Sequence, residues 1–192
     1  MSGKQNRVRI IGGQWGGRRI EFPSIDGLRP TTDPIRETLF NWLQGYLTNA
    51  RCLDLYAGSG ALGFEAASRG AQSVLMVERD TKIIKSLRDN KGALAAETVQ
   101  LMHRTALDYL KTKFKEDTPG FDVVFLDPPF KHGELIECCK YLESSGCLAE
   151  EAVIYLECER KLDLDFLPSN WQQHRCKTAG QVAYYLYHRE SM

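Results

Sequence analysis

The sequence predicts an α/β protein with a mostly parallel sheet that ends in an antiparallel hairpin and is preceded by a small N-terminal β-hairpin. From Arg51 to Glu159, apolar strand-like runs alternate with helical segments, as in parallel strands joined by crossover helices. These runs contain few polar residues, so helices should cover both faces of the sheet. Two further strand-like runs, joined by a short Ala179–Gly180 turn, predict the closing hairpin over residues 172–189.

The individual elements follow from residue periodicity. Residues 8–22 are short β-type runs broken by pairs of glycines, and a turn is expected at Asp26–Gly27. Asp33 and Pro34 resemble a helix N-cap and first helical residue, and apolar residues recur at helical spacing over 34–47. The strands predicted next cover 51–57, 73–79, 98–104, 121–127 and 151–159, and the helices between them cover 61–70, 81–94, 107–114 and 134–145.

The length of 192 residues suits one domain with a small appendage. We expect a basic hairpin extension over residues 1–28 and the main domain over 29–192. The chain has no apolar stretch of the roughly 18 residues that a spanning helix needs, and its N-terminus lacks the apolar core of a secretory signal, so we expect a cytoplasmic protein. The cysteines form no CxxC pair, which favours reduced thiols over a metal site; they are Cys52, Cys138, Cys139, Cys147, Cys158 and Cys176.

Positive charge is concentrated at the N-terminal end. The chain has a net charge of zero, but residues 1–36 contain seven basic and three acidic residues, which leaves +4 there and −4 elsewhere. A basic arm on an acidic body indicates contact with a polyanion, whereas the alternative is a solvated surface hairpin. The predicted RNA-binding residues of this segment are Arg7, Arg9, Arg18, Arg19, Arg29 and Arg36.

A glycine loop follows the first strand of the main domain. The run Leu53–Gly63 contains GxGxxG between a predicted strand and a predicted helix, and Glu78 ends the next strand at the position of an acid that binds ribose hydroxyls. Alone, this motif is also compatible with an NAD(P)-dependent oxidoreductase.

Asp54 argues against a dinucleotide, because its carboxylate would lie near the pyrophosphate that such a loop binds. S-adenosylmethionine has no phosphate, and its ammonium and sulfonium groups are cationic. Asp54 can therefore serve the amino-acid end of this cofactor while Glu78 binds the ribose; alternatively, loop amides alone satisfy Asp54. We also assign Gly58, Ser59 and Gly60 to the cofactor site, because glycine lets the backbone approach a ligand closely.

A second motif, Asp127-Pro128-Pro129-Phe130, follows the fourth strand of the main domain and so should open into the same crevice. It suits methylation of an exocyclic base amine, whose lone pair is delocalised into the ring. Asp127 and the Pro128 carbonyl can accept hydrogen bonds from the amine, and Phe130 can stack on the base. We predict these three residues to be catalytic; the alternative is a simple turn with a packed phenylalanine.

The residue at position 127 also bears on which base is methylated. Guanine presents two adjacent donors, ring N1–H and exocyclic N2–H, and a carboxylate accepts both. Adenine has an acceptor beside its amine and would suit an asparagine better. Asp127 therefore favours guanine.

The chain resembles the RsmD-type ribosomal RNA (guanine-N2)-methyltransferases of the bacterial small subunit. The matching motifs are RIIGGQW (9–15), GLRPTTDPIRETLFNWL (27–43), CLDLYAGSGALGFEAASRGA (52–71), VERD (77–80) and LDPPF (126–130). The resemblance implies a seven-stranded class I methyltransferase fold. It also implies S-adenosylmethionine as cofactor and methylation of guanine 966 of 16S ribosomal RNA during ribosome biogenesis.

The sequence departs from that family's pattern at three places. Gly16 and Pro34 stand where arginines are expected, and Arg104-Thr105-Ala106 lacks the acid that many methyltransferases use for adenine. We therefore expect backbone groups near Thr105 and Ala106 to bind the adenine. The remaining alternatives are an adenine-N6 methyltransferase acting on DNA or RNA, an NAD(P) oxidoreductase and a non-catalytic nucleic-acid-binding module.

Overall fold

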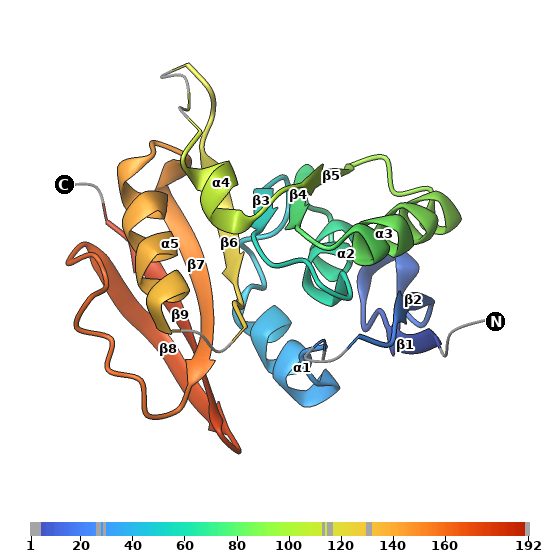
Figure 1. Cartoon of the computed structure of the whole chain (residues 1–192), viewed down its shortest axis with the longest axis horizontal. Coiled ribbons are helices and arrows are strands. Elements are labelled where there is room, and N and C mark those ends of the chain that lie inside the picture. The colour runs from blue at the N-terminus through green and yellow to red at the C-terminus, as the bar shows by residue number, and fades with distance from the viewer. Residues whose placement is uncertain are drawn as a thin grey trace.

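In the computed structural model, a seven-stranded sheet lies between two layers of helices (Figure 1). The structure describes residues 5–25, 28, 30–112, 114, 117–129 and 132–190. The strand order is β5-β4-β3-β6-β7-β9-β8, and a separate two-stranded sheet, β1-β2, forms the N-terminal hairpin. Helices α1, α2 and α3 pack on one face of the large sheet, and α4 and α5 pack on the other.

The elements follow one another in the predicted order. The strands are β1 Gln5–Arg9, β2 Arg19–Pro23, β3 Arg51–Asp54, β4 Ser73–Glu78, β5 Val99–His103, β6 Phe121–Leu126, β7 Leu148–Glu159, β8 Trp171–Ala179 and β9 Val182–Arg189. The helices are α1 Asp33–Trp42, α2 Ala61–Ser68, α3 Thr81–Leu94, α4 Ala106–Leu110 and α5 His132–Ser144, with a 3-10 turn at Gly13–Trp15.

The predicted α/β class is confirmed, including the closing hairpin. Strands β3 to β7 are parallel, and β9 runs antiparallel to both β7 and β8. Strand β9 therefore inserts between β7 and β8, so β8 forms the outer edge of the sheet. The hairpin turn between Ala179 and Val182 consequently returns to the edge at which the parallel strands end.

Helix α1 differs from its prediction at both ends. Its N-cap is Thr32 rather than Asp33, and Asp33 is the first helical residue. The Asp33 side chain does not cap the helix but pairs with the Arg36 guanidinium at 2.6 Å. The helix also ends at Trp42, earlier than expected, and the chain turns through Gly45, whose φ of 95° is left-handed. Tyr46 therefore lies beyond the helix.

The N-terminal hairpin packs against the main domain along its whole inner face. Val8, Ile10, Ile20 and Phe22 are buried in the same hydrophobic core as α2 and α3. The turn after β1 lies so close to α2 that a Cβ on Gly13 would clash with the Ser68 carbonyl oxygen. The hairpin is therefore fixed to the domain by apolar burial, and Arg7, Arg9 and Arg19 lie on its opposite face.

A buried ion pair joins the hairpin, α1 and α2. The Glu65 carboxylate of α2 is fully buried and accepts the backbone N–H groups of Ile11 and Gly12 at 2.6 and 2.8 Å. The Arg36 guanidinium of α1 lies 3.7 Å from the same carboxylate. Arg36 also donates to the backbone oxygens of Thr31 and Arg9. These two side chains satisfy four backbone groups, three in or just after β1 and one just before α1.

Several expectations fall on residues that the structure leaves undescribed: the Asp26–Gly27 turn, Arg29 and Phe130. Within the described part of the chain, no helix is long and apolar enough to cross a membrane. All six cysteines are free thiols, and five of them are buried; Cys176 on β8 is exposed.

Replacing Glu65 with alanine should destabilise the protein by about 3–5 kcal/mol, because it leaves the Ile11 and Gly12 N–H groups without their acceptor and Arg36 with only the partly exposed Asp33 as counter-charge. Urea denaturation measures this loss. The matched control is Glu37→Ala, which removes an exposed glutamate of the neighbouring helix α1 and should change stability by less than about 0.5 kcal/mol. Equal effects of the two substitutions would contradict the role given to Glu65.

Candidate active site

The predicted site residues converge because they follow the carboxyl ends of neighbouring parallel strands. Asp54 ends β3, Glu78 ends β4, and Asp127 follows β6. Asp54 pairs with Met76 on one side and Phe125 on the other, so Glu78 and Asp127 each lie two residues beyond its partners. In an open α/β sheet this edge is where ligands bind.

The glycine loop bends sharply between β3 and α2. Gly58 and Gly60 have left-handed φ values of 49° and 80°. A Cβ on Gly60 would come within 2.7 Å of the Leu87 and Phe64 side chains, so only glycine fits there. Ser59 is buried, and its hydroxyl accepts the Ala61 N–H at 3.3 Å at the start of α2.

Asp54 lies beneath this loop and is 2% exposed. Its carboxylate accepts the Gly63 N–H at 3.1 Å. Burial raises the pKa of Asp54 to about 7; hydrogen bonds from the Tyr56 and Gly63 amides oppose this shift, and the Glu78 charge adds to it. The loop amides only partly offset the desolvation of Asp54. A bound cation at this position would complete the compensation.

Glu78 holds the loop from the other side. One carboxylate oxygen accepts the Gly58 N–H at 3.0 Å, and the other accepts the N–H groups of Arg79 and Asp80 at 2.8 Å each. The side chain remains partly exposed, and the oxygen that accepts the Gly58 N–H has a further lone pair for a ribose hydroxyl. Two acids at this position suit the hydroxyls and positive charges of S-adenosylmethionine.

Thr105 and Ala106 follow β5 at the same edge. The Thr105 hydroxyl accepts the Asp108 N–H at 3.1 Å and so caps α4, while Ala106 is buried. Strand β5 neighbours β4, which ends at Glu78, so Thr105 and Ala106 lie where a cofactor held by Glu78 would pass. Neither residue has an acidic side chain.

Asp127 and Pro128 lie beyond β6 next to the glycine loop. Pro128 is buried, and the Asp127 carboxylate accepts a hydrogen bond from the Thr31 hydroxyl at 3.4 Å. Burial, then the charges of Glu157 and Asp54, raise the pKa of Asp127 well above its usual range. Because the charge of Asp54 contributes to the raised pKa of Asp127, the two motifs share one electrostatic environment.

The sequence analysis missed Glu157, a buried acid on β7. Leu126 pairs with Leu156, so the next positions on the two strands are Asp127 and Glu157. Tyr155 donates to Glu157 at 2.7 Å. A carboxylate within the apolar run EAVIYLECE was the available signal. Its importance depends on the β6–β7 register, which the sequence does not contain.

The predicted RNA-binding arginines differ in their exposure to solvent and in their acidic partners. Arg7, Arg9 and Arg19 are exposed on the outer face of the hairpin, and Arg18 is exposed beside α3, where it donates to the Ala93 carbonyl. Arg7 pairs with Glu21 at 2.7 Å, and Arg9 lies 3.6 Å from Asp33.

The prediction for Arg36 is wrong. Its side chain is fully buried, because Glu65, Asp33 and two backbone oxygens need its charge inside the protein. It therefore cannot reach RNA.

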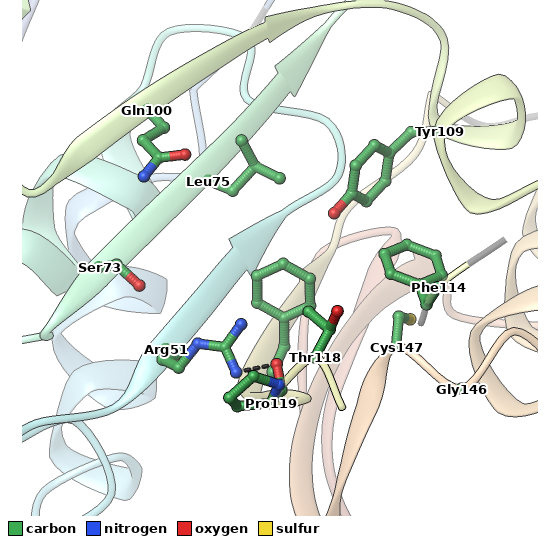
Figure 2. A pocket seen from close by; sticks show the side chains of 11 residues that line it. Arg51, Ser73, Leu75, Gln100, Tyr109, Phe114, Thr118, Pro119, Gly146 and Cys147 are labelled. Atoms are coloured by element: carbon green, nitrogen blue, oxygen red, sulfur yellow. Dashed lines mark hydrogen bonds between the residues drawn. The ribbon is translucent and has the colours of Figure 1, made fainter. Parts of the chain in front are cut away.

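A separate cavity of about 310 Å³ lies at the opposite edge of the sheet (Figure 2). Arg51, Ser73 and Phe121, the first residues of β3, β4 and β6, line it together with Tyr109 and Gln100. The Arg51 guanidinium donates to the carbonyls of Pro119 and Gly120. None of the predicted site residues lines this cavity, so it is distinct from the site at the carboxyl edge.

The strand order, the glycine loop with its two acids, and the DPP segment beside them define a protein of the class I methyltransferase type. A family model, described as conserved hypothetical protein 95, matches residues 8–188. The chain belongs to this family, and the resemblance seen in its motifs is confirmed.

Individual relatives agree with this assignment. Ribosomal RNA small subunit methyltransferase D of Escherichia coli K12 is 48% identical over 96% of this chain and 91% of its own length. Putative rRNA methyltransferase YlbH of Bacillus subtilis is 33% identical over 94% of this chain and 98% of its own. The solved structure of a putative methyltransferase, yhhF, from Escherichia coli superposes with a TM-score of 0.87 at 45% identity and covers 97% of this chain and 100% of that chain.

Replacing Asp54 with asparagine should change how stability depends on pH. The folded pKa of about 7 exceeds the ordinary value of 3.8, so between these values folded Asp54 binds a proton that the unfolded chain has lost. Stability from this group is therefore full at low pH and declines as pH rises through that window, by up to about 4 kcal/mol.

The measurement is urea denaturation from pH 4 to pH 8, together with calorimetry of S-adenosylhomocysteine binding. Asp54→Asn should flatten the pH dependence and weaken the ligand. An unchanged pH slope would show that Asp54 is not desolvated, and unchanged affinity would show that it does not face the cofactor.

Proposed function

We propose that the protein transfers a methyl group from S-adenosylmethionine to the exocyclic N2 amine of a guanine in 16S ribosomal RNA, with guanine 966 as the target. The observation that carries this proposal is the position of the Asp127 carboxyl, at the carboxyl end of β6 and within the electrostatic reach of Asp54. The names of the relatives support ribosomal RNA as the substrate. Such a substrate implies action in the bacterial cytoplasm.

In this proposal the glycine loop and its flanking acids hold the cofactor. Asp54 faces the cationic amino-acid end, Glu78 accepts the ribose hydroxyls, and the backbone near Thr105 and Ala106 contacts the adenine. When bound, the cofactor supplies a methyl group activated by its positively charged sulfur. The buried Asp54 carboxylate gains a cation that compensates the desolvation described above.

Asp127 and Pro128 orient the base. The Asp127 carboxylate accepts the N1–H and one N2–H of guanine, and the Pro128 carbonyl accepts the other N2–H. These bonds hold the amine lone pair toward the methyl group, and positioning of this kind supplies most of the rate enhancement. As the new C–N bond forms, the amine must release one proton, for which Asp127 is the nearest acceptor. Phe130 is proposed to stack on the base.

Thr31 and Glu157 position Asp127. The Thr31 hydroxyl donates its single proton to the Asp127 carboxylate at 3.4 Å. Burial raises the pKa of Glu157, and Tyr155 donates to it. We infer that Glu157 acts on the site through its charge, which raises the pKa of Asp127.

Substitution of Glu157 by glutamine should move the acid limb of the kcat/KM profile to lower pH. The charge of Glu157 contributes to the raised pKa of Asp127, so a neutral amide lets Asp127 ionise at lower pH. The measurement is methyl transfer to RNA from pH 5 to pH 9. Asp127→Ala, as the contrast, should lose about 10²–10³-fold in kcat at every pH. A Glu157 variant with an unmoved profile would show that this residue is only structural.

The test of the proposed target uses small-subunit particles whose 16S ribosomal RNA carries adenine in place of guanine 966. Transfer from labelled cofactor should fall to background, because adenine presents a ring acceptor to the Asp127 carboxylate. Unmodified particles lacking this methyl group serve as the positive control. Undiminished transfer to the substituted particles would refute the assigned position.

A further inference from the structure

The arm supplies less positive charge than the count of its arginines suggests. Arg36 is buried, and Arg7 and Arg9 face acidic partners, which leaves Arg18 and Arg19, among the described arginines of the arm, without an acidic partner in the described part of the chain. A polyanionic substrate that must reach the carboxyl edge of the sheet therefore calls for a second source of positive charge.

The C-terminal hairpin, residues 171–189, is such a source. It contains Arg175, Lys177 and Arg189, together with two histidines, and no aspartate or glutamate. Arg189 is neutralised by Glu143 at 2.8 Å. Arg175 and Lys177 remain on β8, where every residue after Trp171 is exposed. The hairpin therefore presents positive charge without an acidic residue of its own.

The sheet register connects these two cations to the proposed active site. Tyr184 of β9 lies between Glu157 of β7 and Lys177 of β8, and directly paired residues point to the same face. Two strand spacings place Lys177 roughly 10 Å from Glu157. Arg175 follows on the same face, opposite Leu186. Lys177 and Arg175 thus extend the face that carries Glu157 toward the outer edge of the sheet.

Aromatic rings lie beside this charge. Trp42 of α1 stacks on Tyr184 with ring centroids 5.4 Å apart. Tyr46, just after α1, is 38% exposed and contacts the His188 ring edge-on at 5.4 Å. His188 in turn lies 4.4 Å from His174 of β8. An exposed tyrosine beside surface cations is a combination that binds single-stranded RNA by stacking and phosphate contact.

We propose that Arg175, Lys177 and Tyr46 form a second RNA-binding surface, on which the two cations contact phosphates and the tyrosine stacks on a base. The surface lies at the opposite end of the molecule from the N-terminal hairpin, with α1 between them (Figure 1). RNA that enters the active site would thus be held on both sides. This inference rests on the proposed function, because it takes ribosomal RNA as the occupant.

The test measures binding of 16S ribosomal RNA and its small-subunit particles over a salt series. The double variant Arg175→Gln, Lys177→Gln should reduce the slope of log affinity against log salt by about 0.7–0.9 per lost phosphate contact. Tyr46→Ala should weaken RNA binding about 5- to 150-fold, whereas Tyr46→Phe should keep it, because only the ring is needed. Binding of S-adenosylhomocysteine should not change in any of these variants.

The matched control is Lys111→Gln, Lys140→Gln, which removes two exposed lysines that lie after α4 and on α5, on the other face of the sheet. Its salt slope should equal that of the wild type. If the wild type methylates the RNA but the Arg175/Lys177 variant keeps the full slope, the second surface is refuted while the proposed function stands. A wild type that neither binds nor methylates the RNA overturns both. Ultracentrifugation without RNA tests the alternative. A dimer that the wild type forms through β8 and the double variant does not form would assign this edge to a second copy of the chain and overturn the inference.

Discussion

The buried pair of Arg36 and Glu65 is the constraint on which the arrangement of the site depends. Glu65 lies on the helix that follows the glycine loop, and Arg36 holds the backbone oxygen of Thr31, whose hydroxyl reaches Asp127. The same pair binds the hairpin through the N–H groups of Ile11 and Gly12. The glycine loop, Asp127 and the N-terminal hairpin are therefore positioned from one polar centre. A buried ion pair of this kind adds little net stability but strongly disfavours arrangements that leave either charge unpaired.

A second theme is the cost of gathering carboxyls at one edge of the sheet. Asp54, Asp127 and Glu157 are acids whose pKa values burial raises, and the charge of each nearby acid adds to the shift at Asp127. In the free protein the burial of these carboxyls lowers stability, and hydrogen bonds from the glycine-loop amides offset only part of this loss at Asp54. Cationic cofactor groups and the N–H donors of a base are the partners that would relieve it. Buried acids whose raised pKa values lower the stability of the free protein are candidates for function.

Much of the fold could be predicted because its signals are local. Apolar runs mark the strands of the main domain, and the glycines mark the loop before α2 and the turn after β8. The roles of Asp54 and Glu78 were open to inference because each ends a recognisable strand. Glu157 and the surface around Lys177 were not, because they depend on which strands pair and in what register. Arg36 was misjudged since a count of charges does not distinguish a guanidinium on the surface from one held inside by Glu65.

The central claim is that Asp127 presents an acceptor pair that fits guanine. Its most direct test is the identity of the methylated nucleoside. Purified protein, labelled S-adenosylmethionine and unmethylated small-subunit particles would be incubated, and the 16S ribosomal RNA digested to nucleosides for mass spectrometry. The account predicts that the label appears in N2-methylguanosine. Label in N6-methyladenosine instead would contradict it and would show that the carboxylate of Asp127 does not select the base.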